Sequence, residues 1–600
     1  MLAATARAAA QPPTTVPQPA SPPGPRVRAT PPAPPDTGAR RFEGQPLVAC
    51  QGQPIHEIVV DAHPPLGNQR VPRRLKKLER HITALHATTH ESVIRRFLLL
   101  REGDPCDELR RSESERVLRA QPFLVDARVR PYADSVGGVT LLVSTRDEFS
   151  LLLSLAAFTG GGAPPVSTVR LGEANLMGQG IYAVAEWYWG GVGYRDGYLG
   201  RFTDYQFLGK PYQLSVLGER RDVGGQWAAD LSYPFYTDLQ RVGWRTSAGD
   251  AHEYRELLRP GGVSNALFYD RRYANVGGIV RLGVPGRLSL FGASATFERA
   301  STADRIRILS DTGAVADGGP PLGFAPSGRF PGQNVARINA LWGVRNVSFE
   351  RISGFDALTG TQDVRRGFQA SVLFGRSVPF FRSHDDDYFV SSDAYAGVGG
   401  PRSFLAGELR GEARRDNARG TWDGVIVGGR GAWYLVPGAR FRVVSSVEYG
   451  GTRRPRIPVQ LSLGDRLGGV RGYDGSTIAG AARAVARVEP RVVFGPKFGL
   501  GEFGAAAFAD VGRLWAGDAP YGVSTPARAS VGVGLLGAFP PGSRRLWRID
   551  LAKPLTREPG APKFRIIVDN RDLTRVFWRE PGDVSNGRER SSPASLYNWP

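Results

Sequence analysis

The sequence predicts a mainly β protein: a transmembrane antiparallel β-barrel of roughly 16 strands, preceded by a small α/β domain. From residue 147 to 569, short segments of alternating apolar and polar residues are separated by Gly, Pro, Asp and Asn. No stretch approaches the roughly 20 apolar residues that a spanning helix requires. Within the β pattern, Leu467-Gly-Gly-Val-Arg-Gly-Tyr473 sets one arginine among glycines. Such a sequence suits a sharply folded loop that presents a buried cation.

Length and charge limit the possible functions. Six hundred residues exceed what one small core needs, so at least two domains are expected. The net charge of +20 would suit nucleic acid, anionic lipid or a charged lumen as a partner. The basic residues are scattered, however, and only Arg73-Arg74-Leu-Lys76-Lys77 forms a compact cluster. Because no nucleic-acid recognition motif accompanies the charge, we expect no nucleic-acid partner.

Residues 1–52 form a leader rich in Pro, Ala and Thr. Its first 11 residues lack both a basic start and a full apolar core, so they are not a complete secretory signal. The remainder cannot bury enough apolar surface to offset its ordering entropy, which predicts a mostly disordered tether. The only two cysteines are Cys50 and Cys106. They form one disulfide in an oxidising compartment or remain two inert thiols, and the sequence leaves both open.

Residues 53–146 are predicted to form a small domain with the element order β-α-α-β-β. Thr88-Thr-His-Glu91 offers a capping box before apolar residues that share one helical face, and Gly103-Asp-Pro105 ends that helix. The expected strands are 55–60, 123–129 and 139–144, and the second helix is expected over 107–118. This order suits a sheet with two helices on one face.

The barrel domain is predicted over 147–570. Its alternation is clear in the segments 181–189, 212–219, 441–449, 547–551 and 564–568. Trp547, Ile549 and Leu551, for example, oppose Arg548 and Asp550. A soluble sandwich would bury the apolar face, whereas a membrane barrel turns it outward, and periodicity alone does not decide between them. With roughly 16 strands, each strand and its loop would take about 26 residues.

Several ordered motifs in this region resemble those of a known superfamily. A V-R-G-[FY] motif is matched by Val470, Arg471, Gly472 and Tyr473, and an F-x-D-x-G motif by Phe508, Asp510 and Gly512. Further matches are Arg548-Ile-Asp550-Leu-Ala-Lys-Pro-Leu555, Gly172-Glu-Ala-Asn175-Leu-Met-Gly178-Gln-Gly180 and Leu231-Ser-Tyr-Pro234-Phe235. The chain from 53 to 570 thus resembles the outer-membrane assembly and translocation superfamily, which includes BamA, TamA, the bacterial surface antigens and the two-partner secretion transporters.

This resemblance implies a site. In the superfamily, the V-R-G-[FY] loop folds back into a barrel of 16 strands. By that resemblance Asp510 would be the inner-wall carboxylate that receives Arg471, and Glu489 is a second candidate. An arginine inside a barrel needs such a partner, and guanidinium–carboxylate pairs can be bidentate. The first and last strands, near 148–158 and 563–569, would form a weak lateral seam.

The resemblance also implies a function and a location. The small domain is similar to a POTRA domain, and only one is found here, whereas BamA-like proteins carry several. We therefore expect a protein of the bacterial outer membrane, with the POTRA-like domain in the periplasm, that helps to insert or translocate polypeptides. Its partners would be outer-membrane lipids and lipopolysaccharide, unfolded client polypeptides and periplasmic accessory proteins. The alternatives are a passive pore or surface antigen without client activity, and a soluble β-rich secreted protein.

Other chemical motifs point to simpler interpretations, and neither an enzyme nor a cofactor is expected. Gly532-Val-Gly-Leu-Leu-Gly537 fits a dinucleotide fingerprint, but no helix follows it, so strand glycines are the better account. His86 and His90 lack a third metal ligand, which favours a solvated helix start. His384-Asp-Asp-Asp387 suits an exposed loop better than a cation site. The polar tail 571–600 is interpreted as an appendage without an assigned role.

Overall fold

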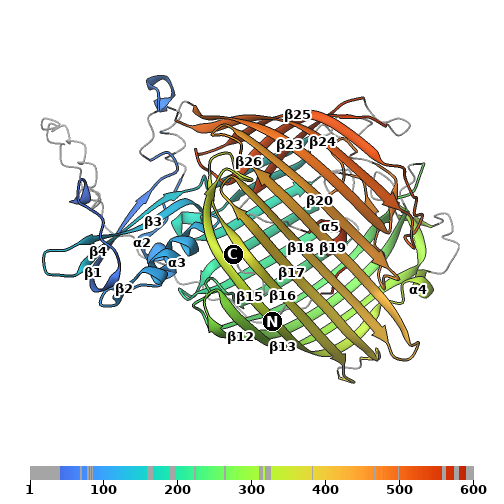
Figure 1. Ribbon diagram of the computed structural model, residues 1–600. Helices are drawn as coiled ribbons and strands as arrows, with labels where there is room; N and C mark the ends of the chain where they lie inside the picture. Colours follow the sequence, from blue (N-terminus) through green and yellow to red (C-terminus); the bar gives the residue numbers. More distant parts are fainter. Residues whose placement is uncertain are drawn as a thin grey trace, which may run out of the picture.

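The computed structural model contains a small α/β domain beside a large β-barrel (Figure 1). It describes residues 41–67, 71–77, 80, 83, 86–157, 166–188, 197–221, 224–261, 265–309, 315–317, 326–380, 383–464, 468–473, 476–497, 499–556, 563–572 and 580–589. The predicted tether over residues 1–40 and Leu467 of the glycine-rich motif lie outside these ranges. In the described part of the chain, no helix is long and apolar enough to cross a membrane.

The small domain is a four-stranded sheet with the strand order β2-β1-β4-β3. Its elements are β1 (Gln51–His63), η2 (Arg73–Leu75), α2 (Glu91–Phe97), β2 (Pro105–Asp107), α3 (Glu108–Arg119), β3 (Leu124–Ala133) and β4 (Val139–Asp147). Strands β1 and β4 are parallel, and the other pairs are antiparallel. The predicted helices and strands are present, but α2 ends at Phe97, six residues before the Gly103-Asp-Pro105 break that was expected to end it. The sequence analysis missed β2, because three residues are too few to show an alternating pattern.

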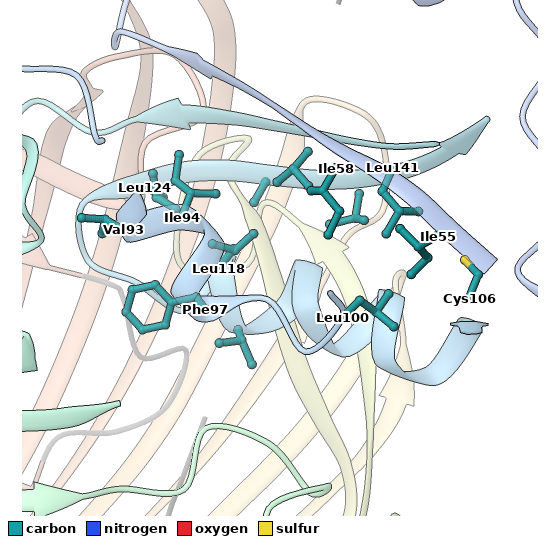
Figure 2. Close-up of a cluster of buried hydrophobic side chains, with 14 of the residues drawn as sticks. Ile55, Ile58, Val93, Ile94, Phe97, Leu100, Cys106, Leu118, Leu124 and Leu141 are labelled. Carbon is teal, nitrogen blue, oxygen red and sulfur yellow. The ribbon is translucent and has the colours of Figure 1, made fainter. Parts of the chain in front are cut away.

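One apolar core joins both helices to the sheet. Figure 2 shows its side chains, among them Ile55 and Ile58 from β1, Phe97 from α2 and Leu118 from α3. Cys50 and Cys106 lie beside this core and form a disulfide, with their Cα atoms 4.9 Å apart. Of the two alternatives that the sequence left open, one disulfide or two inert thiols, the structure shows the disulfide.

Two expectations about this domain are wrong. Residues 41–52 were expected to belong to the disordered tether, but the Phe42 ring stacks on Tyr132 at 4.8 Å and Leu47 forms a β-bridge to the same residue. Apolar burial and the disulfide thus order this segment. The expected capping box does not form either: His90 is the N-cap of α2 and makes no side-chain cap bond.

The barrel is a closed antiparallel sheet in which β27 returns beside β5. Its strands are β5 (Leu151–Ala157), β6 (Val166–Glu173), β7 (Ile181–Tyr188), β8 (Gly197–Phe207), β9 (Tyr212–Arg221), β10 (Gly224–Tyr233), β11 (Val242–Leu257), β12 (Asn265–Val284), β13 (Arg287–Leu309), β15 (Gln333–Ser353), β16 (Thr361–Ser377), β17 (Asp387–Gly400), β18 (Ser403–Asp416), β19 (Thr421–Leu435), β20 (Phe441–Arg453), β23 (Ala482–Lys497), β24 (Gly501–Trp515), β25 (Arg528–Ala538), β26 (Arg545–Pro554) and β27 (Arg565–Asp572). Short elements accompany them: η3 (Leu176–Gly178), β14 (Val315–Asp317) beside β13, α4 (Pro326–Arg329), the pair β21 (Leu461–Ser462) and β22 (Ala479–Gly480), and α5 (Gly582–Ser585).

The expectation of about 16 strands is therefore wrong, since the sheet contains 20. It assumed long loops, but several hairpins turn within two residues, as at 285–286 and 401–402. Residues that were expected to form long loops therefore belong to additional strands. The last expected strand, 563–569, corresponds to β27, and the first, 148–158, to β5.

The two faces of the barrel wall have opposite character, and the apolar one points outward. In β26, Ile549 and Leu551 are 53% and 43% exposed, whereas Arg548 and Asp550 are 3% and 2% exposed. The same holds for many large apolar side chains around the barrel, including Trp187, Phe202, Val216, Trp227, Phe291, Ile338, Trp342, Phe374, Trp433, Phe441, Val447, Val533, Phe564, Ile566 and Val568. A soluble sandwich would bury these residues, so the outward apolar face excludes that alternative.

The small domain contacts one end of the barrel through several turns. Arg119 of α3 donates to both Asp363 oxygens, at 2.9 and 2.7 Å, and Arg116 donates to the Tyr236 carbonyl at 2.6 Å. Arg544, in the turn before β26, donates to the Leu124 carbonyl at 2.9 Å. Backbone atoms contribute as well, because the His90 amide donates to the Gly178 carbonyl at 2.9 Å.

Candidate functional site

The loop over 454–481 joins β20 to β23 and carries the glycine-flanked arginine. The turns that contact the small domain, such as 174–180 and 539–544, join strands at one end of the barrel. Because connections in an antiparallel sheet alternate between the two ends, this loop starts from the opposite end. It then folds back along the inner wall, where Val470 is completely buried and packs on Val485 and Leu514.

Arg471 is held by carboxylates from the strands β23, β24 and β26. Its Nε and Nη2 donate to the two Asp510 oxygens at 2.8 and 2.7 Å, which makes the pair bidentate. Its Nη1 donates to Glu489 at 2.7 Å and to Asp550 at 3.4 Å. The Arg471 guanidinium carbon also lies 3.5 Å from the centre of the Phe508 ring. The guanidinium is thus fixed both in its plane and from one face.

Two further arginines complete a charge-balanced network. Arg491 donates to Glu489 at 2.7 Å, and Arg548 donates to both Glu489 oxygens at 2.9 Å. Arg548 also contacts Asp550 at 3.0 Å. Three guanidiniums therefore face three carboxylates, so the formal charges within this network balance.

The glycines of the motif give the loop its close fit. Gly472 has φ of +88°, a conformation that favours glycine, and a Cβ there would come within 3.1 Å of Pro554 on β26. On the wall, a Cβ at Gly512 would come within 2.5 Å of a Val470 methyl group. Tyr473 donates from its hydroxyl to the Thr556 carbonyl at 2.6 Å and so ties the loop to the strand end.

The alternation of β24 explains the F-x-D-x-G spacing. Phe508, Asp510 and Gly512 are two residues apart, so all three face the lumen. The first packs on the guanidinium, the second binds it, and the third leaves room for the loop. The structure thus brings every predicted site residue from Val470 to Asp550 into one place, while their functional role stays a prediction.

A second charged cluster in the lumen involves the tail, whose interpretation as an appendage is wrong. Glu589 forms ion pairs with Arg337 of β15 and with Arg414 of β18, the latter at 2.7 Å. Asp583 pairs with Arg483 of β23 at 2.6 Å. The segment 580–589 therefore lies inside the barrel. The tail residues 573–579 and 590–600 lie outside the described residues.

The sequence analysis missed these tail contacts. A polar, charged segment after the last strand has the composition of a solvated tail, and nothing local distinguishes it. Inward-facing arginines on several strands, such as Arg337 and Arg414, were the available signal. They require carboxylates in the lumen, and the barrel strands alone do not supply all of them.

The three motifs for which the sequence favoured a simpler interpretation can be located in the structure. Gly532–Gly537 lies within β25, as expected for strand glycines. His86 does not sit at a solvated helix start, because its side chain is buried and contacts Asp147 at 2.9 Å. Asp387, expected in an exposed loop, is also buried and pairs with Arg337 at 2.9 Å. The described residues contain no cluster of His, Cys, Asp and Glu that could hold a metal ion.

By sequence, no known protein family and no curated protein matches this chain. Similar solved structures include BamA from Haemophilus ducreyi lacking POTRA domains 1–3, at 13% identity over 86% of this chain and 85% of that one, with a TM-score of 0.36. CdiB from Acinetobacter baumannii is 10% identical over 86% and 74%, and CdiB from Escherichia coli is 12% identical over 86% and 75%, each with a TM-score of 0.37. Likenesses with such TM-scores do not assign a function to this chain.

Proposed function

We propose that the protein spans the bacterial outer membrane and assists the insertion or translocation of other polypeptides. The observation that carries this proposal is the loop bearing Arg471, which is anchored on the inner wall by Asp510, Glu489 and Asp550. The motif of this loop resembles that of the outer-membrane assembly and translocation superfamily, which favours a role with clients over a passive pore. The anchor gives the barrel a defined internal element beside its last strands, β24 to β27.

The outward apolar face supports the membrane location. A closed barrel satisfies its backbone groups internally, so lipid meets only side chains. The outer side chains of the wall are apolar, whereas charged pairs such as Arg548 and Asp550 lie inside. We infer that outer-membrane lipids and lipopolysaccharide surround the barrel.

The small domain supports a role with clients, but only part of its sheet edge is open. On β3, the Val129 amide donates to Glu115 at 2.9 Å and its carbonyl accepts from Arg111 at 2.6 Å, so α3 covers that edge. On β1, Ile58 is likewise bonded to Glu102 and Arg95. Val60 lies two residues further on, with its backbone groups directed the same way.

We infer that a client strand adds to the sheet beside Val60. A photo-crosslinking residue at position 60 should trap an unfolded client, and one at Arg128, on the covered β3 edge, should not. Equal trapping at both positions would contradict this placement.

The main test is Arg471→Ala in a conditional-depletion strain. The variant barrel should fold, because the wall strands keep their backbone hydrogen bonds. Client assembly should fall at least ~10-fold, because the loop loses its anchor. A loss of this size corresponds to the energy of one charge-assisted hydrogen bond. Arg419→Ala, at a far more exposed arginine in a turn, is the matched control. Full complementation by Arg471→Ala would overturn the proposal.

A passive pore is the second candidate, and the width of the barrel favours it. A sheet of 20 strands encloses a lumen wide enough for an aqueous channel. Stable conductance by the purified protein, unchanged when clients are added, would support this candidate and count against the first.

A further inference from the structure

The segment 580–589, called here the lumenal segment, is seated on the inner wall like a bound peptide. It contains α5 and contacts side chains or carbonyls of β12, β15, β18, β20 and β23. These strands lie within one run of the barrel order, from β12 to β23. The lumenal segment also meets the loop that carries Arg471, since a Cβ at Gly468 would come within 2.6 Å of Pro581.

Two acidic side chains anchor the lumenal segment. The Glu589 side chain is 1% exposed and lies between Arg337 and Arg414. The Asp583 side chain is 5% exposed and binds Arg483 with both oxygens, at 2.6 and 3.1 Å. Buried charges require partners of opposite sign. The wall thus offers arginines at two places that match two carboxylates six residues apart.

The wall is also shaped for the apolar and backbone parts of the lumenal segment. Val584 is 1% exposed and packs among Ile426, Ile457 and Leu461. A Cβ at Gly450 would come within 2.8 Å of a Val584 methyl group, so glycine leaves the space that the valine fills. Arg271 donates to the Arg588 carbonyl at 2.9 Å. The site therefore recognises charge, shape and backbone together.

We propose that these wall residues form a peptide-binding site in the lumen, that the lumenal segment is its built-in occupant, and that an incoming acidic polypeptide displaces it and opens the barrel. The ligand class is a turn-forming segment with two carboxylates that flank a small apolar residue. The identity of the incoming polypeptide as a client rests on the proposed function. The site and its occupant do not.

Ion conductance across planar bilayers tests this inference without any client. Deleting 580–600 should raise the conductance several-fold, and a synthetic peptide of residues 580–589 should reduce it again. A peptide with Asp583→Asn and Glu589→Gln should not block. In the full chain, the same two substitutions should increase opening, whereas Asn586→Ala, at an exposed position of the same turn, should not.

An engineered disulfide gives a second test in the full-length protein, in case the truncated chain does not fold. The Cβ position of Gly450 lies close enough to the Val584 side chain for Gly450→Cys and Val584→Cys to form a bridge. The oxidised protein should lack opening events, and reduction should restore them. The proposal would be overturned if the oxidised and reduced proteins had equal conductance. It would also be overturned if the truncated and full chains had equal conductance and the peptide did not block either. Loss of client assembly alone would bear only on the proposed function.

Discussion

At the scale of single residues, the partners of Arg471 were predicted, and the part of Arg491 was not. The resemblance implied Asp510 and Glu489 as partners, and the two-residue spacing of Phe508, Asp510 and Gly512 places all three on the lumen side of β24. Arg491 joins them from another strand, and its place depends on the register of β23 against β24. The sequence does not reveal that register, because the hairpin contains an irregularity between Val493 and Gly495 that shifts the pairing.

The space at Gly512 gives a test that changes no charge. Gly512→Ala should push Val470 and its loop off the wall, because the new methyl group would meet the valine side chain. We expect a destabilisation of about 1–3 kcal/mol and faster proteolysis of the loop at 468–473. Gly431→Ala is the matched control, since a Cβ there meets nothing within 4 Å. Identical proteolysis of the two variants would contradict the fit.

At the scale of elements, the small domain was predictable because its helices and strands have clear periodicity and clear ends. What the sequence did not reveal is how the domain sits on the barrel. Glu113 of α3 accepts from Arg116 at 2.9 Å and from the Thr237 hydroxyl in a barrel turn. The contact with Thr237 joins residues 124 positions apart, and neither partner shows a motif.

The contact at Glu113 predicts a pH dependence. Burial alone raises the pKa of Glu113, but the charge and hydrogen bonds of Arg116 and the bond from Thr237 outweigh it and lower the pKa below its ordinary value. Its stabilising contribution is therefore complete above the ordinary carboxyl pKa and is lost as pH falls through the lowered pKa.

Hydrogen exchange of α3 in detergent should accordingly stay constant from neutral pH down to about pH 4 and increase below it, after correction for the intrinsic rate. Glu113→Gln should raise exchange at neutral pH and remove most of this dependence. Glu91→Gln, on the exposed part of α2, should behave like the parent. A pH profile unaffected by Glu113→Gln would contradict the role of this carboxylate.

The disulfide gives a second test at this scale. Cys50 and Cys106 are separated by 56 positions, for which the loop-entropy relation gives about 4 kcal/mol of stabilisation. Cys50→Ser should therefore expose residues 41–52 to protease, because this segment packs on the sheet next to the bridge. Reducing agent should have the same effect on the parent and none on the variant. Equal cleavage of oxidised parent and variant would contradict this role.

At the scale of the whole molecule, the sequence predicted the β class and the two-faced wall, and the resemblance predicted a membrane barrel with its apolar face outward, but the number of strands was not predicted. Alternation fixes which residues share a face, as for Ile549 and Leu551. Periodicity alone does not say whether that face points into the barrel or out of it. The strand number depends on loop lengths, and the two-residue turns at 285–286 and 401–402 resemble the interior of a longer strand with a glycine or proline in it.

The outward face predicts an effect that a soluble protein would not show. Ile549→Arg places a charge on an exposed surface, which is harmless in water but should cost about 2–4 kcal/mol near the middle of a bilayer. We expect less folded protein in membranes, measured by the heat-dependent shift on gels. Val136→Arg, at an exposed turn of the small domain, is the control. Equal yields of both variants would contradict a lipid-facing wall.

The position of α5 after all twenty strands has a consequence for how the cylinder is made. Residues 580–589 follow β27, the strand that shuts the ring against β5, yet they end up enclosed by it. A ring that closed before this segment arrived could admit it only through an open end. Biogenesis must therefore either delay the closure of β27 against β5 or thread the segment in through one end, and a bulky fusion attached at the carboxyl end should slow the second route but not the first.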